Sequence, residues 1–111
     1  MTIKEVCSFL KKCDNVNILT HKSPDGDTLG SGFALLNFLR SMGKKANVLN
    51  TEPFPERYSF LYDGYSPMDF KEEYVIAVDV ADIQLLGDNL EKYTQEGKID
   101  LCIDHHISNT F

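Results

Sequence analysis

The sequence predicts one α/β domain built on an open, mostly parallel sheet of about four strands, with helices on both faces. Three observations predict this fold class. The chain has 111 residues, a length that suits a single compact domain. Short β-prone apolar runs alternate along it with stretches of helical hydrophobic period. Strands that are separated by helices favour right-handed βαβ units, and such units produce parallel pairing.

The first part of the chain contains a predicted helix, a strand and a loop. Residues 2–13 are predicted to form an amphipathic helix from the spacing of four apolar side chains: Ile3, Val6, Cys7 and Leu10. Residues 16–20 are a short β-prone run. Residues 21–27 are predicted to be a loop, because the Pro-Asp-Gly within them is a strong turn signal.

A second helix and a second strand are predicted next. The helix is expected from about Asp27 to near Met42, with Gly43 placed as the left-handed residue after its end. Its apolar face is defined by four side chains at helical spacing: Leu29, Phe33, Leu36 and Leu39. Residues 46–50 are then predicted to be a strand.

The second half of the chain is less regular at first. Residues 51–73 have a mixed pattern with three prolines as breakers, and a short helical turn is expected at residues 57–62. Residues 74–79 are a nearly continuous apolar run, as expected for a strand that is covered on both faces. A helical stripe follows at residues 83–93, and residues 99–103 are predicted to be the last strand.

Polar side chains follow three of the predicted strands at the point where each strand ends. They include all three histidines of the chain and four of its aspartates: His21, Asp25, Asp27, Asp79, Asp104, His105 and His106. In open parallel sheets, ligands bind at the carboxyl ends of the strands, near a reversal of strand order. We therefore expect these side chains to converge on one edge of the sheet.

Carboxylates together with imidazoles are a suitable ligand set for a divalent ion such as Mn²⁺. Two ions about 3.5–4 Å apart can activate a water and clamp the attacking and leaving oxygens of an in-line displacement. The predicted helix that begins near Asp27 would add a positive N-terminus, which favours an anion such as phosphate. These parts fit metal-assisted hydrolysis of a phosphoester.

Each part of this pattern also has a simpler interpretation. Asp25 and Asp27 could bind two different ions, or one could bind while the other caps the helix, and the Pro-Asp-Gly-Asp run alone is most often a turn. Asp79 could cap the next helix, and His105 with His106 could be a surface pair. The joint pattern, with every histidine included, favours a metal site.

The charge of the chain restricts its partners. With 17 acidic and 11 basic side chains, its formal charge is −6, which argues against a large basic groove for duplex nucleic acid. A small anionic substrate is still compatible, because bound divalent cations reverse the local field. No apolar run approaches the length of a membrane span, and the N-terminal residues lack a secretory signal, so we expect a cytoplasmic protein without a membrane partner.

The three cysteines are odd in number and contain no C-x-x-C pair. This argues against a disulfide framework and against a structural zinc site. Cys7 and Cys102 lie in apolar patterns and are expected to be small buried hydrophobes.

Three segments resemble the first three signature motifs of the DHH phosphoesterase superfamily, in the expected order: residues 21–31, residues 78–79 and residues 104–109. Within this superfamily the chain is most similar to the branch of nanoRNases and pAp phosphatases, near the RecJ-type exonucleases. The resemblance extends from about Asn17 to Asn109. It implies that residues 1–111 are the N-terminal part of a Rossmann-like DHH catalytic domain.

The resemblance implies a Mn²⁺-dependent hydrolase with two ions, for which Mg²⁺ is an alternative. His21, Asp25 and Asp79 would hold one ion. Asp27, Asp79 and His105 would hold the other, so that Asp79 bridges the two. A water between the ions would be the nucleophile.

Two further residues would complete the catalytic set. Asp104 would orient its neighbours without binding a metal itself, and His106 would face the phosphate of the substrate. The implied substrates are short single-stranded oligoribonucleotides and a nucleoside phosphate, the 3′-phosphate of 3′-phosphoadenosine 5′-phosphate (pAp). A homodimer is the assembly that we consider for a full-length protein of this kind.

Two features of the family are not found in these residues. No residue after Asn109 can supply the aspartate of the fourth motif, and the C-terminal substrate-binding domain is absent. We therefore expect a truncated catalytic domain that is inactive alone. Three alternatives stay open: another hydrolase of the superfamily that acts on pyrophosphate, polyphosphate or a cyclic dinucleotide, a non-catalytic metal- or nucleotide-binding module, and a purely structural domain.

Overall fold

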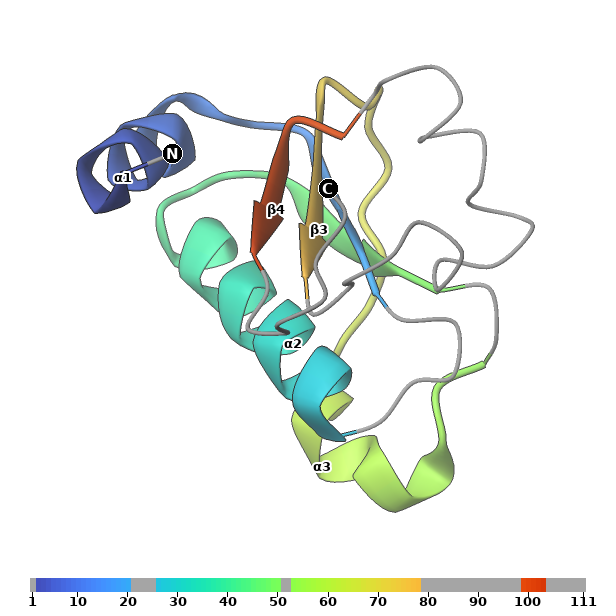
Figure 1. Cartoon of the computed structure of the whole chain (residues 1–111). Helices are drawn as coiled ribbons and strands as arrows, with labels where there is room; N and C mark the ends of the chain where they lie inside the picture. Colours follow the sequence, from blue (N-terminus) through green and yellow to red (C-terminus); the bar gives the residue numbers. More distant parts are fainter. Residues whose placement is uncertain (1, 21–25, 51–52, 79–98, 104–111) are drawn as a thin grey trace.

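The computed structural model describes residues 2–20, 26–50, 53–78 and 99–103. Within these ranges the chain forms a four-stranded sheet in the order β2-β1-β3-β4, and every neighbouring pair is parallel (Figure 1). The strands are β1 (Val16–Leu19), β2 (Ala46–Leu49), β3 (Tyr74–Val78) and β4 (Leu101–Ile103). The predicted α/β class with an open parallel sheet is confirmed.

The described helices are α1 (Ile3–Lys12), α2 (Gly26–Ser41) and α3 (Ser59–Tyr62), with a 3₁₀ turn η1 (Glu56–Tyr58) directly before α3. They confirm the helices predicted in these ranges to within about two residues, the usual uncertainty of helix ends. The predicted helix at residues 83–93 lies outside the described residues. None of the helices in the described ranges combines the length and the apolar character that crossing a membrane requires.

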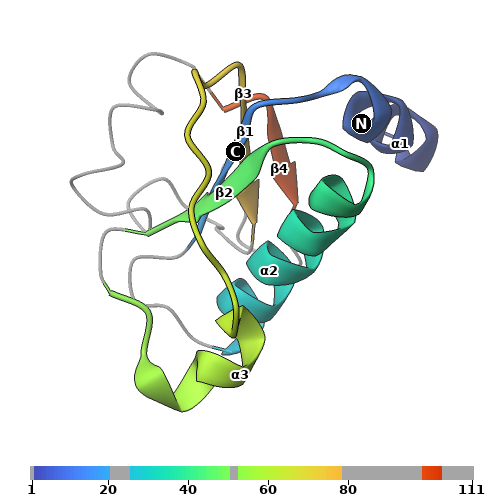
Figure 2. The same cartoon turned by 180° about the vertical axis from the view of Figure 1, so that it is seen from behind.

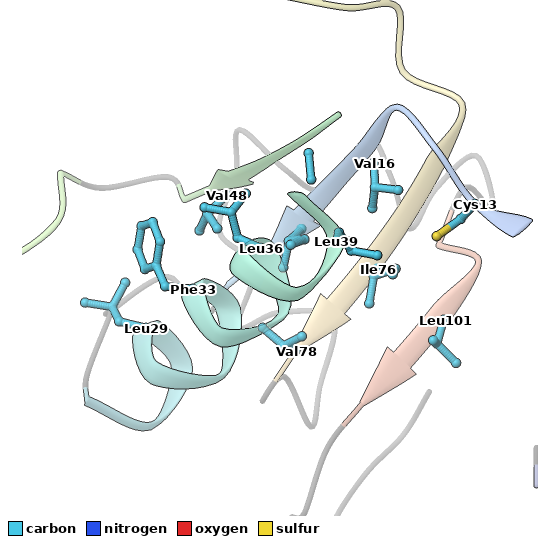
Figure 3. Packing of buried hydrophobic residues seen from close by; sticks show 12 residues of the cluster. Cys13, Val16, Leu29, Phe33, Leu36, Leu39, Val48, Ile76, Val78 and Leu101 are labelled. Carbon is cyan, nitrogen blue, oxygen red and sulfur yellow. The ribbon is translucent and has the colours of Figure 1, made fainter. Parts of the chain in front are cut away.

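The main hydrophobic core lies between α2 and one face of the sheet (Figure 3). All four side chains predicted for the apolar face of α2 are buried in it, each at most 3% exposed: Leu29, Phe33, Leu36 and Leu39. Alternate residues of the strands meet them, for example Ile76 and Val78 of β3. Full burial of one such side chain contributes about 1.5–3 kcal/mol, so this face provides much of the stability.

The opposite face of the sheet is buried as well. It contributes Leu19, Val75 and Ala77, which are at most 2% exposed. Cys102 was expected to be a buried hydrophobe and is half-buried against this cluster. Burial on both faces confirms the interpretation of the apolar run in β3. The described helices pack on the first face, so helix cover of this second face stays a prediction.

α1 has satisfied backbone groups at both of its ends. The Thr2 hydroxyl accepts a hydrogen bond from the Glu5 N–H (3.1 Å), and the Glu5 carboxylate accepts one from the Thr2 N–H (3.2 Å). The Thr2 backbone donor lowers the pKa of the Glu5 carboxyl. At the other end, the Lys44 ammonium donates to the carbonyls of Lys11 and Cys13. Such caps supply the partners that a helix end lacks.

The buried face of α1 differs from the predicted one. The side chains of α1 that pack against the main core are Val6, Phe9 and Leu10. Phe9 meets the ring of Tyr74 edge to face at 5.5 Å. Ile3 is 85% exposed and Cys7 is exposed, so the prediction that Cys7 is a buried hydrophobe was wrong. The helix is rotated about its axis so that its aromatic residue reaches β3.

The turns at the amino edge of the sheet are joined through Asp14. Its Oδ1 accepts hydrogen bonds from the backbone N–H groups of Lys45 (2.8 Å) and Asn15 (2.8 Å). Both donors lower the pKa of the Asp14 carboxyl, and the N–H of Lys45 has the larger effect. Burial raises the pKa of the neighbouring Cys13 thiol, which suits a packing role. The side chains described at this edge therefore serve the connection of α1 to the sheet.

Candidate metal centre

The order of the strands reverses between β1 and β3. From β1 the chain crosses to β2 on one side, and from β3 it crosses to β4 on the other. In open parallel sheets the crevice at such a switch point, outside the carboxyl ends of the strands, is where ligands bind. The strands also end together, because Leu19 pairs with Ala77 and Val78 pairs with Ile103.

The residues predicted for the site follow directly from these strand ends. Asp79 is the residue after Val78, the last of β3, and Asp104 is the residue after Ile103, the last of β4. His21 comes two residues after the end of β1. Each of the three polar segments therefore comes directly after, or within two residues of, the carboxyl end of a described strand in the sequence.

The first turn of α2 lies against the end of β3. Thr28 is fully buried, and its hydroxyl donates a hydrogen bond of 3.4 Å to the carbonyl of Val78. The N-terminus of α2 is therefore at the same edge of the sheet as the residue that precedes Asp79 (Figure 1). The unpaired N–H groups of a helix N-terminus and its positive dipole favour a bound anion such as phosphate.

Thr20 fixes the chain where it leaves β1 toward His21. Its N–H and its hydroxyl both donate to the carbonyl of Leu49, at 3.1 and 2.7 Å. The same hydroxyl accepts a hydrogen bond of 2.7 Å from the side-chain amide of Asn50. Thr20 is fully buried, so these bonds replace the water that the strand end would otherwise need.

Gly32 allows α2 to approach the strands closely. A Cβ at this position would lie 3.1 Å from the methyl carbon of Thr20 and 3.7 Å from side-chain carbons of Val48 and Val78. The sequence pattern alone indicates no individual role for Thr20, Thr28 or Gly32. A glycine inside a helical pattern is a signal of close packing that could have identified Gly32.

Substitution of Gly32 by valine is expected to destabilise the protein by about 1–3 kcal/mol, because the added methyl groups overpack the contact with Thr20. The midpoint of urea denaturation measures this change. Gly30 is the matched control in the same helix, since the described chain has no atom within 4 Å of a Cβ there. Gly30→Val should change stability by less than about 0.5 kcal/mol, because no described atom crowds the added side chain and valine is a slightly better helix former than glycine. Equal midpoints for the two variants would show that Gly32 is not a packing constraint.

Among the predicted site residues, the structure describes the backbone of Asp27, which is the second residue of α2. The other predicted residues lie outside the described ranges: His21, Asp25, Asp79, Asp104, His105 and His106. Within those ranges no group of three or more His, Cys, Asp or Glu side chains is arranged to hold a metal ion.

The fold is an α/β domain with an open parallel sheet, and its strand order contains a switch point of the kind at which such domains bind ligands. Residues 15–111 match the model of the DHH family, N-terminal domain. The match covers most of the chain and begins after α1, so the chain belongs to the DHH family. Members of this family are metal-dependent phosphoesterases. The chain therefore belongs to the hydrolases of the phosphoesterase type.

Proposed function

We propose that this chain carries the metal-binding part of a Mn²⁺-dependent phosphoesterase of the nanoRNase and pAp-phosphatase type. The observation that supports this most directly is the common edge formed by the carboxyl ends of β1 and β3 and the N-terminus of α2. In the sequence, the motif residues follow these strand ends and the start of α2. A phosphoester substrate needs both parts there: ligands for divalent ions, and a helix N-terminus for a phosphate.

The donor set fits divalent ions of the Mn²⁺ type, because it combines carboxylate oxygens with imidazole nitrogens and contains no thiolate. His21, Asp25 and Asp79 would hold one ion. Asp27, Asp79 and His105 would hold the other. When bound, such ions supply polarisation of a phosphate oxygen and a lowered pKa for a water molecule.

The protein groups have their own tasks in this proposal. Asp104 orients the neighbouring ligands, and His106 donates a hydrogen bond to a phosphate oxygen. The first-turn N–H groups of α2 face the same edge and stabilise negative charge on the phosphate. Thr20 and Thr28 hold the two chain segments in place without contacting the substrate.

Short oligoribonucleotides and the 3′-phosphate of pAp are the substrates that we propose, from the resemblance of the motifs. Both present a small anion that the acidic chain can accept once divalent ions are bound. Duplex nucleic acid would need a basic surface, which a formal charge of −6 does not favour.

The test uses the protein of the natural reading frame that contains this sequence. Two activities are measured with Mn²⁺, with Mg²⁺ and with EDTA. The first is phosphate release from pAp, and the second is degradation of oligoribonucleotides that are about three to five nucleotides long. Pyrophosphate, polyphosphate and a cyclic dinucleotide serve as competing substrates. We expect turnover of pAp or of the oligonucleotides with Mn²⁺ and none with EDTA. Turnover limited to a competing substrate would identify another hydrolase of the family, and metal binding without any turnover would identify a binding module.

A further inference from the structure

The segment η1–α3 lies beside the N-terminal half of α2, the helix whose first turn contacts the carboxyl end of β3. Tyr62 of α3 contacts Phe33 of α2, with ring centroids 5.9 Å apart. Phe33 is five residues after Thr28, which corresponds to about 8 Å along a helix axis. Both views show α3 beside the first turns of α2, beyond the tips of the strands (Figures 1 and 2).

The two sides of this segment differ in burial. Tyr58, Leu61 and Tyr62 are half-buried and pack against the main core. Phe60 is 73% exposed, and Arg57 is exposed as well. Residues three apart lie on the same side of a 3₁₀ or α-helical turn, so Arg57 and Phe60 are neighbours on the outer side.

Arg57 is already arranged as a stacking group. Its guanidinium lies 5.0 Å from the centre of the Tyr58 ring, a cation–π arrangement. The core contacts of Tyr58 hold the ring on which the guanidinium rests. The outer side of η1–α3 therefore presents a planar cation and an exposed aromatic ring next to each other.

We propose that Arg57 and Phe60, supported by Tyr58, form a platform on which a nucleobase of the substrate stacks. Every base has a π-face, and proteins bind single strands by combining aromatic rings with cations that attract the backbone. The Arg57 guanidinium supplies one positive charge that complements the phosphates of a nucleotide, although Glu56 and Asp63 are exposed at the two ends of the same segment. The inference rests on the proposed function, because it assigns the base-recognition part of the same site.

The platform makes the substrate class more specific. A phosphoesterase that reads only the phosphate would treat substrates with and without bases alike. With a stacking platform beside the metal centre, a base adds binding energy at some distance from the reacting phosphate. Loss of the platform should therefore raise KM and leave kcat unchanged.

The experiment compares a short oligoribonucleotide with the same oligonucleotide carrying one abasic position at each site in turn. For Phe60→Ala we expect KM for the base-containing substrate to rise about 5- to 150-fold, the range for loss of one stacked base. KM for the substrate that lacks the stacked base should not change. Phe60→Trp should keep the wild-type KM. Phe38→Ala is the matched control, since Phe38 is 49% exposed in the C-terminal half of α2.

A second measurement separates the platform from the catalytic proposal. An oligonucleotide with 2-aminopurine is titrated into the protein in EDTA, where quenching of fluorescence reports stacking without turnover. We expect quenching by the wild type and not by Phe60→Ala. If turnover is absent but this difference is found, the proposed function fails and the platform stands. If Phe60→Ala and Phe38→Ala behave alike in both measurements, the proposal of a stacking platform is wrong. Loss of self-association in Phe60→Ala would then indicate that this surface contacts another protein molecule.

Discussion

Asp79→Ala is expected to abolish tight Mn²⁺ binding by this chain. Asp79 directly follows β3, whose last carbonyl, that of Val78, accepts the hydroxyl of Thr28 at the start of α2. In the proposed centre Asp79 would be a ligand of both ions, so the substitution would remove a ligand from each. We expect the Mn²⁺ affinity to fall at least about 100-fold, beyond the range for residues that only orient ligands. Titration calorimetry at micromolar Mn²⁺ measures the change.

Two further variants make this experiment specific. Asp69→Ala removes an exposed aspartate from the segment before β3 and should leave Mn²⁺ binding unchanged. Asp104→Ala removes a residue that would orient ligands in the proposed centre without binding a metal, so its expected loss of affinity is smaller, about 10- to 100-fold. If the wild type bound no more Mn²⁺ than Asp79→Ala, the two-metal proposal would be wrong for this chain. Equal losses for Asp79→Ala and Asp69→Ala would indicate a general effect of charge.

The sheet and α2 could be predicted from the sequence because their apolar patterns are compatible with one choice of buried side chains. The apolar run of β3 has no polar position at which a face could be exposed, and the structure buries both faces. In α2 a single stripe of apolar residues runs from Leu29 to Leu39, and that stripe is the one in the core. The left-handed Gly43, with φ of 78°, ends the helix as predicted.

α1 shows where periodicity becomes ambiguous. Two overlapping stripes satisfy the helical spacing, one through Ile3 and Cys7 and another through Phe9 and Cys13. Both share Leu10, so the sequence does not decide which stripe faces the sheet. The contact of Phe9 with Tyr74 decides it, and that contact joins elements far apart in the chain. The exposure of Cys7 follows from this choice.

For the candidate site, the sequence predicted the carboxyl edge of the sheet, but it did not predict the contacts that hold α2 and the strand ends together there. The strand ends that precede His21, Asp79 and Asp104 lie where the sequence predicted them, and the strand order reverses between β1 and β3. The placement of the three side chains stays a prediction. The contacts of Thr20 and Gly32 could not be predicted, since they depend on the distance between α2 and the sheet. The roles of the ligands themselves stay predictions.

Phe33→Ala is expected to cause a large loss of stability. Phe33 is 3% exposed, and its ring meets those of Phe54 at 5.4 Å and Tyr65 at 5.1 Å, both edge to face. Removing a buried phenyl ring costs about 3–5 kcal/mol. Since domains of this size are stable by only about 5–15 kcal/mol, the variant should unfold at a much lower urea concentration. Hydrogen exchange should become faster first in η1–α3, which this ring holds against α2.

Phe60→Ala is the matched control for this prediction, because it removes the same ring from an exposed position of the segment that Phe33 anchors. Its expected effect on stability is within about 0.5 kcal/mol. Similar denaturation midpoints for the two variants would contradict the packing described for Phe33.

At low temperature, where Phe33→Ala is still folded, its Mn²⁺ affinity should equal that of the wild type, because α2 stays attached to the sheet through Leu36, Leu39 and the bond from Thr28 to Val78. A parallel loss of stability and Mn²⁺ affinity would instead mean that η1–α3 is needed to hold the metal centre.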